Sequence, residues 1–447
     1  MTYRYRIALI FIAGFFIDCV NIFISTVSLP AIAQQLALSP ASVVWVSNSY
    51  ILGLTLIIPL GPWLAARFGA RATLVASMLL FSAAALLAGL ADRFLTLTLF
   101  RFIQGVGGGL LIPVGQALAF SLFPAQERAR LSTLIMSVAL IAPAISPALG
   151  GALVDHYSWR WVLLAPLPFS LATALLAGLW VKSAAPQAKK PDWQGLLLVS
   201  LTLTLLLCGL SGYADAPSKT LPTLLLLAGV LAGLCYLRYA RQRSDALIDL
   251  HIVRHPRMRF SLAVYYAIPG LFTGVNVLAA FWLQQDLGWS AEESGALMLL
   301  YAAGALGAML VSGKLWLRLG APRLFCAALL LHAAGIALLA TGASHWLPLA
   351  WLVMGIGGGI GANTAQATAL TDFDGAALAR ASVVWNLNRQ IAFSAGAALL
   401  TLIFTLARQH LPQPDAWRVT FAISAAAGLL PLFALPSFTK RICHGKP

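Results

Sequence analysis

Long runs of apolar residues recur along the whole chain and are separated by short polar or charged stretches. Each run is about 20 residues long, which is the length that an α-helix needs to cross the hydrocarbon core of a bilayer. The runs lie at 7–29, 43–65, 72–91, 96–122, 132–153, 161–181, 194–213, 221–240, 260–284, 293–313, 324–342, 346–370, 381–405 and 418–436. The pattern therefore predicts an all-α polytopic membrane protein with fourteen spans, whose even number places both termini on the same side.

The composition agrees with this prediction and excludes a water-soluble globule. Hydrophobic residues make up 60% of the 447 residues and charged residues only 10%, whereas about 45–50% of an ordinary soluble domain is apolar. The first run is too long for the core of a signal peptide and lacks a small-residue cleavage site, so we expect it to stay as a span. The 5 cysteines form no CxxC pair, and we expect neither a metal nor another cofactor.

The distribution of Lys and Arg along the chain predicts its orientation in the membrane. A formal charge of +15 on a soluble protein would suggest a polyanionic partner such as nucleic acid. Here 22 of the 29 Lys and Arg residues fall on the side that holds both predicted termini, 5 fall on the other side and two lie in the interior of spans, when residues at the ends of runs are counted with the adjoining loops. Because Lys and Arg resist translocation, this bias predicts cytoplasmic termini. No nucleic-acid partner is expected.

The chain contains an internal repeat with a period of about 250 residues. After the second run come Arg67 and Gly69, and after the tenth run come Arg318 and Gly320, at an offset of 251. The fourth and twelfth runs share a glycine cluster at an offset of 250, which consists of Gly105, Gly107, Gly108 and Gly109 in one and Gly355, Gly357, Gly358 and Gly359 in the other. The repeat predicts a six-helix half at 1–181, a two-helix insert with cytoplasmic linkers at 182–259, and a second six-helix half in the same orientation at 260–447.

Several motifs together resemble the fourteen-span drug:proton antiporter branch of the major facilitator superfamily. The loop after the second run is similar to the superfamily's Gly-x-Leu-Ala-Asp-Arg-x-Gly-Arg loop, and Arg101-Phe-Ile-Gln104-Gly105 is similar to the proton-relay motif of the fourth span. Pro143-Ala-Ile-Ser146-Pro147-Ala-Leu-Gly150-Gly151 resembles the antiporter motif of exporters, with Ser146 in place of a usual glycine. Asp192-Trp-Gln-Gly195 and Asn388-Arg389-Gln390 are also typical of the branch.

The resemblance implies a protein of the bacterial inner membrane, with one substrate site near the midplane between its two halves. The expected function is proton-coupled export of amphiphilic or lipophilic small molecules such as drugs by alternating access, with protons and membrane lipid as the other partners, and we expect a monomer. Two alternatives remain open: export of one endogenous metabolite, and an uncoupled facilitator. An intramembrane enzyme is not expected, because His332 is the only histidine within a span and has no evident nucleophile beside it.

Asp18 and Arg101 are the candidates for proton coupling. Asp18 is the only carboxylate in the interior of a span, roughly 16 Å along the first helix and so near the midplane. Ionisable groups at this depth are usually functional, and the alternative is a structural carboxylate that accepts hydrogen bonds from neighbouring Ser or Asn side chains. Related exporters carry their Asp nine residues before the Pro that ends the first span, where this chain has Asn21. Arg101 keeps its proton and needs a partner, for which Asp18 is a candidate.

A set of polar and aromatic side chains within spans is expected to line the substrate cavity. In the thirteenth run, Asn386, Arg389 and Gln390 share one helix face, and interhelical hydrogen bonding explains them equally well. The whole candidate set comprises Asn21, Trp45, Tyr50, Gln104, Gln116, Phe272, Asn276, Asn363, Gln366, Asn386, Arg389 and Gln390.

The candidate gating residues lie in the hinge loops and in the fifth run. They are Arg67, Gly69, Arg71, Glu127, Pro143, Pro147, Gly150, Gly151, Arg318 and Gly320. The superfamily's loop has an Asp where this chain carries Ala66 and, in the repeat, Leu317. The Asp-to-Arg contact expected from the resemblance is therefore missing at these positions, and Glu127, Asp372 or Asp374 is expected to replace it.

Overall fold

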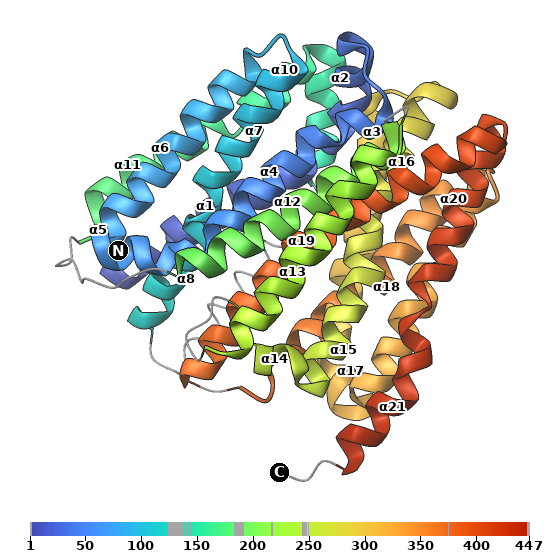
Figure 1. The fold of residues 1–447 in the computed structure, drawn as a ribbon. Coiled ribbons are helices and arrows are strands. Elements are labelled where there is room, and N and C mark those ends of the chain that lie inside the picture. The colour runs from blue at the N-terminus through green and yellow to red at the C-terminus, as the bar shows by residue number, and fades with distance from the viewer. Residues whose placement is uncertain are drawn as a thin grey trace. The chain divides into compact units, whose positions relative to one another are not determined.

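The computed structural model describes residues 2–123, 138, 141–142, 145–182, 192–215, 218–243, 248, 250–373 and 375–444 (Figure 1). Within these residues most of the chain is helical, short turns and loops connect the helices, and there is no β-strand. The predicted all-α fold class is confirmed. Contacts between Cα atoms divide the chain into two compact units, unit 1 with residues 1–39, 43–200 and 289–295, and unit 2 with residues 40–42, 201–288 and 296–447.

Unit 1 contains the helices of the first predicted half. They are α1 (Tyr3–Ile24), the 3₁₀ turn η1 (Thr26–Ser28), α2 (Leu29–Leu36), α4 (Trp45–Ile57), η2 (Ile58–Leu60), α5 (Gly61–Phe68), α6 (Ala70–Gly89), α7 (Phe94–Gly109), α8 (Leu111–Leu122), α10 (Trp159–Leu164) and α11 (Leu167–Trp180), with a further helical segment at 145–156. Helix α7 packs on α4 and α6, and α1 packs on α8 and α11.

Unit 2 contains the helices of the second predicted half. They are α14 (Leu250–Arg254), α15 (Pro256–Tyr265), the π-helical turn η3 (Tyr266–Gly270), α16 (Leu271–Phe281), the π-helical turn η4 (Trp282–Asp286), most of α17 (Ala291–Ala340), η5 (Ser344–Trp346), α18 (Leu347–Leu370), α19 (Gly375–His410), α20 (Gln413–Gly428) and α21 (Pro431–His444). Helix α16 packs on α19, and α15 packs on α18. The four-residue helix α3 (Pro40–Val43) lies at the division between the units.

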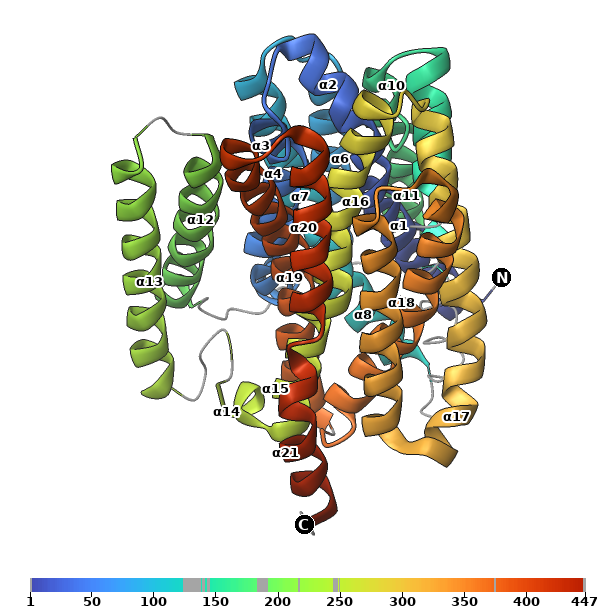
Figure 2. The ribbon, with the colours of Figure 1, turned by 90° about the vertical axis from the view of Figure 1, so that its right-hand side faces the viewer.

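Helices α12 (Trp193–Asp215) and α13 (Thr220–Arg241) form a pair that lies side by side (Figure 2). A Cβ atom built on Gly229 would lie 2.9 Å from Leu206, so the glycine permits a close helix contact. Only 17% of the apolar window of each helix is buried, against 72% for the span Pro256–Asp286. Most of the surface of both helices is therefore not covered by the rest of the chain.

Twelve helices in the described part of the chain are long and apolar enough to cross a membrane. They coincide with twelve of the fourteen predicted runs. Of the other two, 132–153 lies partly outside the described residues, and 346–370 corresponds to the continuous 24-residue helix α18. The structure is thus compatible with fourteen spans.

The repeat is visible in the packing of each unit. A Cβ built on Gly105 would lie 2.0 Å from the carbonyl oxygen of Tyr50, and one built on Gly355 would lie 2.0 Å from that of Tyr301. Tyr50 and Tyr301 are themselves related by the offset of 251. Glycine is required at both positions because the helix backbones touch there. The predicted glycine repeat is therefore a repeat of helix contacts.

The hinge loops repeat as well. Gly69 separates α5 from α6 with φ 85°, and Gly320 interrupts α17 with φ 73°. Both conformations favour glycine because a side chain would be strained there. The adjoining Arg67, Arg71 and Arg318 are exposed.

Candidate functional site

A cluster of buried polar side chains lies in unit 1 where α1 faces α4 and α7. Helix α1 contributes Asp18 and Asn21, and Ser25 caps its C-terminal end. These residues are spaced at i, i+3 and i+7, so they lie on one helical face. All three are buried. The cluster is therefore built from one stripe of α1 and from residues of the two helices beside it.

Tyr50 of α4 holds the carboxylate of Asp18. Its phenol donates a hydrogen bond of 2.5 Å to Oδ1 of Asp18, and both side chains are buried. A Cβ built on Gly108 of α7 would lie 3.0 Å from the Tyr50 oxygen and 3.5 Å from Oδ1 of Asp18. The glycine thus leaves the space in which the phenol and the carboxylate meet.

Arg101 of α7 is fully buried and spreads its donors over several partners. Its Nε donates to the carbonyl oxygen of Val46 at 3.0 Å. Its Nη1 donates to Oδ1 of Asn21 at 3.1 Å and to Oε1 of Gln104 at 2.9 Å. Its Nη2 donates to Oγ of Ser25 at 3.4 Å. The predicted neighbours Arg101 and Gln104 therefore share a face and a hydrogen bond.

Tyr50 contacts both charged residues of this cluster, the acid Asp18 and the cation Arg101. The Arg101 guanidinium carbon lies 4.7 Å from the centre of the Tyr50 ring, a cation–π distance. Within the described residues no carboxylate forms an ion pair with Arg101; its partners are carbonyl, amide and hydroxyl oxygens and the aromatic ring. The direct pairing with Asp18 that the sequence suggested is not formed in this structure. The Tyr50 side chain contacts both groups instead, the carboxylate through its hydroxyl and the guanidinium through its ring.

The repeat provides an internal comparison for the cluster. In unit 2, Tyr301 stacks on Phe272 with ring centres 3.9 Å apart, and no acid of the described residues takes the place of Asp18. The counterparts of Arg101 and Gln104 are Trp351 and Met354, which are buried. The same helix packing therefore supports a charged hydrogen-bond network in one unit and an aromatic, apolar core in the other.

The structure separates the predicted cavity residues into buried and partly exposed groups. Those that are buried are Asn21, Tyr50, Gln104, Phe272, Asn276 and Gln390. Those that are partly exposed are Trp45, Asn363, Gln366, Asn386 and Arg389, and Asn363 donates a hydrogen bond of 3.1 Å to Oγ of Ser312. The side chain of Gln116 lies outside the described residues. Asn21, Tyr50 and Gln104 belong to the cluster around Asp18 and Arg101.

The predicted gating residues are described only in part. Glu127, Pro143 and Asp374 lie outside the described residues, while Pro147, Gly150 and Gly151 are buried in the segment 145–156. Asp372, the remaining candidate for the missing hinge acid, accepts a hydrogen bond from Arg257 and lies 3.2 Å from Nδ1 of His255. This acid therefore contacts the N-terminal end of α15.

Asp155 is a functional candidate that the sequence did not indicate. Its carboxylate accepts hydrogen bonds from the backbone amides of Ala291 at 3.1 Å and Glu292 at 2.7 Å, within unit 1. These are the first two amides of α17, which have no partner inside the helix. A Cβ on Gly151 would lie 2.3 Å from the carbonyl oxygen of Ala291. Gly151, the last residue of the antiporter-like motif, and Asp155 thus both lie against the N-terminal end of α17. The two segments are far apart in the sequence, so this contact could not be predicted from it.

Comparisons with known proteins agree with this architecture. The model of the Major Facilitator Superfamily matches residues 10–195 and 262–441. The unmatched interval contains α13 and most of α12. The Multidrug resistance protein B homolog of Mycobacterium tuberculosis is 30% identical over 384 residues, which are 83% of this chain and 70% of the relative. The Putative multidrug resistance protein MdtD of Escherichia coli is 26% identical over 437 residues, which are 95% of this chain and 92% of the relative.

Solved structures share the fold at low sequence identity. The peptide transporter POT in complex with sulfate has a TM-score of 0.72 and 15% identity, covering 98% of this chain and 94% of that chain. The xylose transporter XylE from E. coli has a TM-score of 0.66 and 14% identity, covering 100% of both chains. Together with the family match over both halves, these similarities identify a multi-pass membrane transporter rather than an enzyme: the chain belongs to the Major Facilitator Superfamily.

Proposed function

We propose that this transporter exports amphiphilic or lipophilic small molecules, such as drugs, in exchange for protons. The observation that carries the proposal is the buried Asp18–Tyr50–Arg101 arrangement in unit 1. Its acid is the only carboxylate that lies away from the ends of a predicted span. The names of the two multidrug resistance relatives support the substrate class.

The cluster suits a proton carrier because its net charge changes with the state of one group. With Asp18 ionised, its negative charge balances the positive charge of Arg101 within the buried network. With Asp18 protonated, the network keeps one uncompensated positive charge. An uncompensated charge is unfavourable in a buried environment. The ionised and the protonated form of Asp18 therefore favour different conformations of the carrier. Protonation of Asp18 therefore shifts the equilibrium between the two conformations of the carrier without moving any other charged group.

Arg101 supplies a permanent charge for this cycle. A guanidinium does not lose its proton at physiological pH, whereas a carboxylate does. The four hydrogen-bonded partners of Arg101 fix its position independently of Asp18. We infer that Arg101 stays in place while Asp18 is loaded and unloaded, and that Tyr50 transmits the change to α4.

The substrate class follows from the shortage of charge elsewhere in the spans. Asp18 is the one acid, and Arg101 and Arg389 are the two basic residues, that lie away from the ends of the predicted spans. Apolar and aromatic side chains dominate the remainder, which suits compounds with a large apolar surface and few charges. The orientation that we propose has both termini in the cytoplasm of a bacterial cell, with export toward the outside.

The test is efflux of ethidium from vesicles reconstituted with the full-length protein and energised by an imposed proton gradient. We expect gradient-driven efflux that Asp18→Asn abolishes. Asp92→Asn is the control, because Asp92 is 85% exposed and pairs with Arg160 at the surface. Efflux that persists after the gradient collapses would favour the uncoupled facilitator. No ethidium flux, with flux of one metabolite in a substrate screen, would favour the metabolite exporter.

A further inference from the structure

Helix α13 carries a stripe of exposed leucine side chains that ends at two arginines. The leucines, which are 57% to 62% exposed, are Leu224, Leu227, Leu231 and Leu234. They follow one another at spacings of three or four residues, so they lie on one face of the helix. The same spacing leads next to Arg238 and Arg241, which are also exposed. This face is therefore apolar along the helix and positively charged at its C-terminal end.

The length of the leucine stripe matches one leaflet of a bilayer. From Leu224 to Leu234 the helix rises about 15 Å at about 1.5 Å per residue. Half of a hydrocarbon core of about 30 Å is also about 15 Å. Arg238 follows roughly 6 Å further along the helix axis. When acyl chains lie along the leucines, the two arginines are therefore at the depth of the lipid headgroups, on the side that the charge bias predicts to be cytoplasmic.

The charges of Arg238 and Arg241 are not neutralised by an acid of the described part of the chain. Neither guanidinium forms an ion pair with a carboxylate of the described residues, whereas Arg257 of α15 pairs with Asp372. Helix α13 itself contains no Asp or Glu. Both guanidinium groups are therefore available to a negatively charged ligand.

The surroundings of this helix end add positive charge and aromatic side chains. Arg243 is exposed, and its guanidinium carbon lies 4.9 Å from the centre of the Tyr239 ring. The backbone amide of Ile248 donates a hydrogen bond of 2.7 Å to the hydroxyl of Tyr236. Helix α14, which contacts α13, ends at the exposed Arg254 (Figure 2). Tyrosine and arginine together at a helix end are typical of the boundary between hydrocarbon and headgroups.

We propose that this face of α13 binds an anionic phospholipid, with an acyl chain along the leucine stripe and the phosphate group at Arg238 and Arg241. A guanidinium matches a phosphate with two parallel hydrogen bonds. A headgroup with a net negative charge, such as that of phosphatidylglycerol, is attracted by both arginines, whereas the ammonium group of phosphatidylethanolamine offsets this attraction.

A second copy of the chain is the weaker occupant of the same face. It would fit the leucines, but it would bury two arginines against a stripe that offers no acid to pair with them, which is unfavourable. The proposed lipid site lies on the two-helix insert and does not depend on proton coupling.

The test is native mass spectrometry of the full-length protein with equal amounts of phosphatidylglycerol and phosphatidylethanolamine that carry the same acyl chains. One basic residue near an anionic headgroup strengthens binding about fivefold, so we expect phosphatidylglycerol to be preferred by roughly five- to 25-fold. The double variant Arg238→Gln, Arg241→Gln is expected to lose most of this preference. The double variant Arg238→Lys, Arg241→Lys keeps both charges and is expected to keep it.

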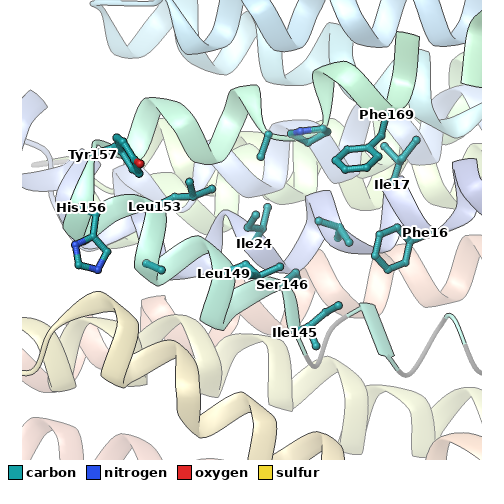
Figure 3. A pocket seen from close by; sticks show the side chains of 14 residues that line it. Phe16, Ile17, Ile24, Ile145, Ser146, Leu149, Leu153, His156, Tyr157 and Phe169 are labelled. Atoms are coloured by element: carbon teal, nitrogen blue, oxygen red, sulfur yellow. The ribbon is translucent and has the colours of Figure 1, made fainter. Parts of the chain in front are cut away.

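Two control variants locate the site. Arg323→Gln removes an exposed arginine of α17 and is expected to leave the preference unchanged. Ala152→Trp fills an apolar groove of unit 1, which α1, the helical segment 145–156 and α11 line (Figure 3). The described lining of this groove includes no Arg or Lys, so the preference is again expected to stay.

Three results would overturn the proposal. Equal binding of the two lipids, or a preference that the double glutamine variant retains, would leave the arginines only the role of orienting the chain. A loss in the double lysine variant as large as in the glutamine variant, or an equal loss in either control, would show that the charge of this pair does not select the lipid. A dimer without bound lipid would assign the leucine stripe to a second copy.

Discussion

The phenol of Tyr50 donates a 2.5 Å hydrogen bond to the carboxylate of Asp18, while the Arg101 guanidinium carbon lies over the ring of the same side chain, 4.7 Å from its centre. One aromatic ring thus joins the acid and the permanent cation of the cluster. Because all three side chains are buried, a substitution of any one of them changes the electrostatic environment of the other two. This relationship leads to the first two predictions.

Tyr50→Phe keeps the ring against Arg101 and removes only the hydroxyl that contacts Asp18. A hydrogen bond to a charged group contributes about 1.5–3 kcal/mol, so we expect gradient-driven transport to fall by roughly 10- to 100-fold. The matched control is Tyr301→Phe at the repeat position, where the ring stacks on Phe272. Vesicle transport assays measure both variants. Equal losses in the two variants would assign Tyr50 a packing role only.

Arg101→Lys keeps the positive charge but removes the planar set of donors. The acceptors of Val46, Asn21 and Gln104 then lose their shared partner in a buried site, at about 1–3 kcal/mol for each unsatisfied group. We expect a lower thermal unfolding temperature in detergent together with reduced transport. Arg93→Lys on the exposed N-terminal side of α7 is the control. A lysine variant as stable and active as the original protein would show that charge alone is sufficient.

Gly105→Ala and Gly355→Ala test the repeated helix contact. In both, the new Cβ would lie 2.0 Å from a backbone carbonyl oxygen, which cannot be accommodated without separating the helices. We expect each to lower the free energy of unfolding by about 1–3 kcal/mol, visible as a lower unfolding temperature. Gly307→Ala is the control, because nothing lies within 4 Å of its Cβ position. Alanine is the better helix former, so this control is expected to be neutral or slightly stabilising. A similar loss there would show that the close helix contact is not the cause.

Asp155→Ala removes the side-chain cap of α17. The amides of Ala291 and Glu292 lose their acceptor, at a cost of about 0.5–2 kcal/mol. We expect faster hydrogen exchange at the start of α17. His156→Gln tests the neighbouring contact with Glu292, which is exposed on both sides, and is expected to change exchange little. Unchanged exchange in Asp155→Ala would mean that Ser290 and Glu293, which also cap this helix, are sufficient.

The fold could be predicted from the sequence because its signals are local or repeated. Span length depends on composition alone, and the glycines shared at an offset of 250 residues mark the positions where helix backbones touch. Arg101 and Gln104 could be placed together because residues three apart share a helix face.

The part of the site that the sequence could not indicate depends on contacts between distant helices. Tyr50 recurs as Tyr301, so the repeat itself suggests a packing residue, and only the structure shows that one copy holds an acid. The backbone oxygen of Val46 carries no sequence signal at all, although it binds Arg101. The direct contact between Asp18 and Arg101 was suggested by their charges, but the intervening ring takes its place.

The proposed exchange of substrate for protons depends on the carboxyl group of Asp18. The most direct measurement is the change in internal pH when ethidium is added to reconstituted vesicles that hold a proton gradient and a trapped pH-sensitive dye. Ethidium is expected to accelerate proton movement with the original protein and with Asp92→Asn, and to have no effect with Asp18→Asn. Substrate-dependent proton movement that is undiminished in Asp18→Asn would contradict the account.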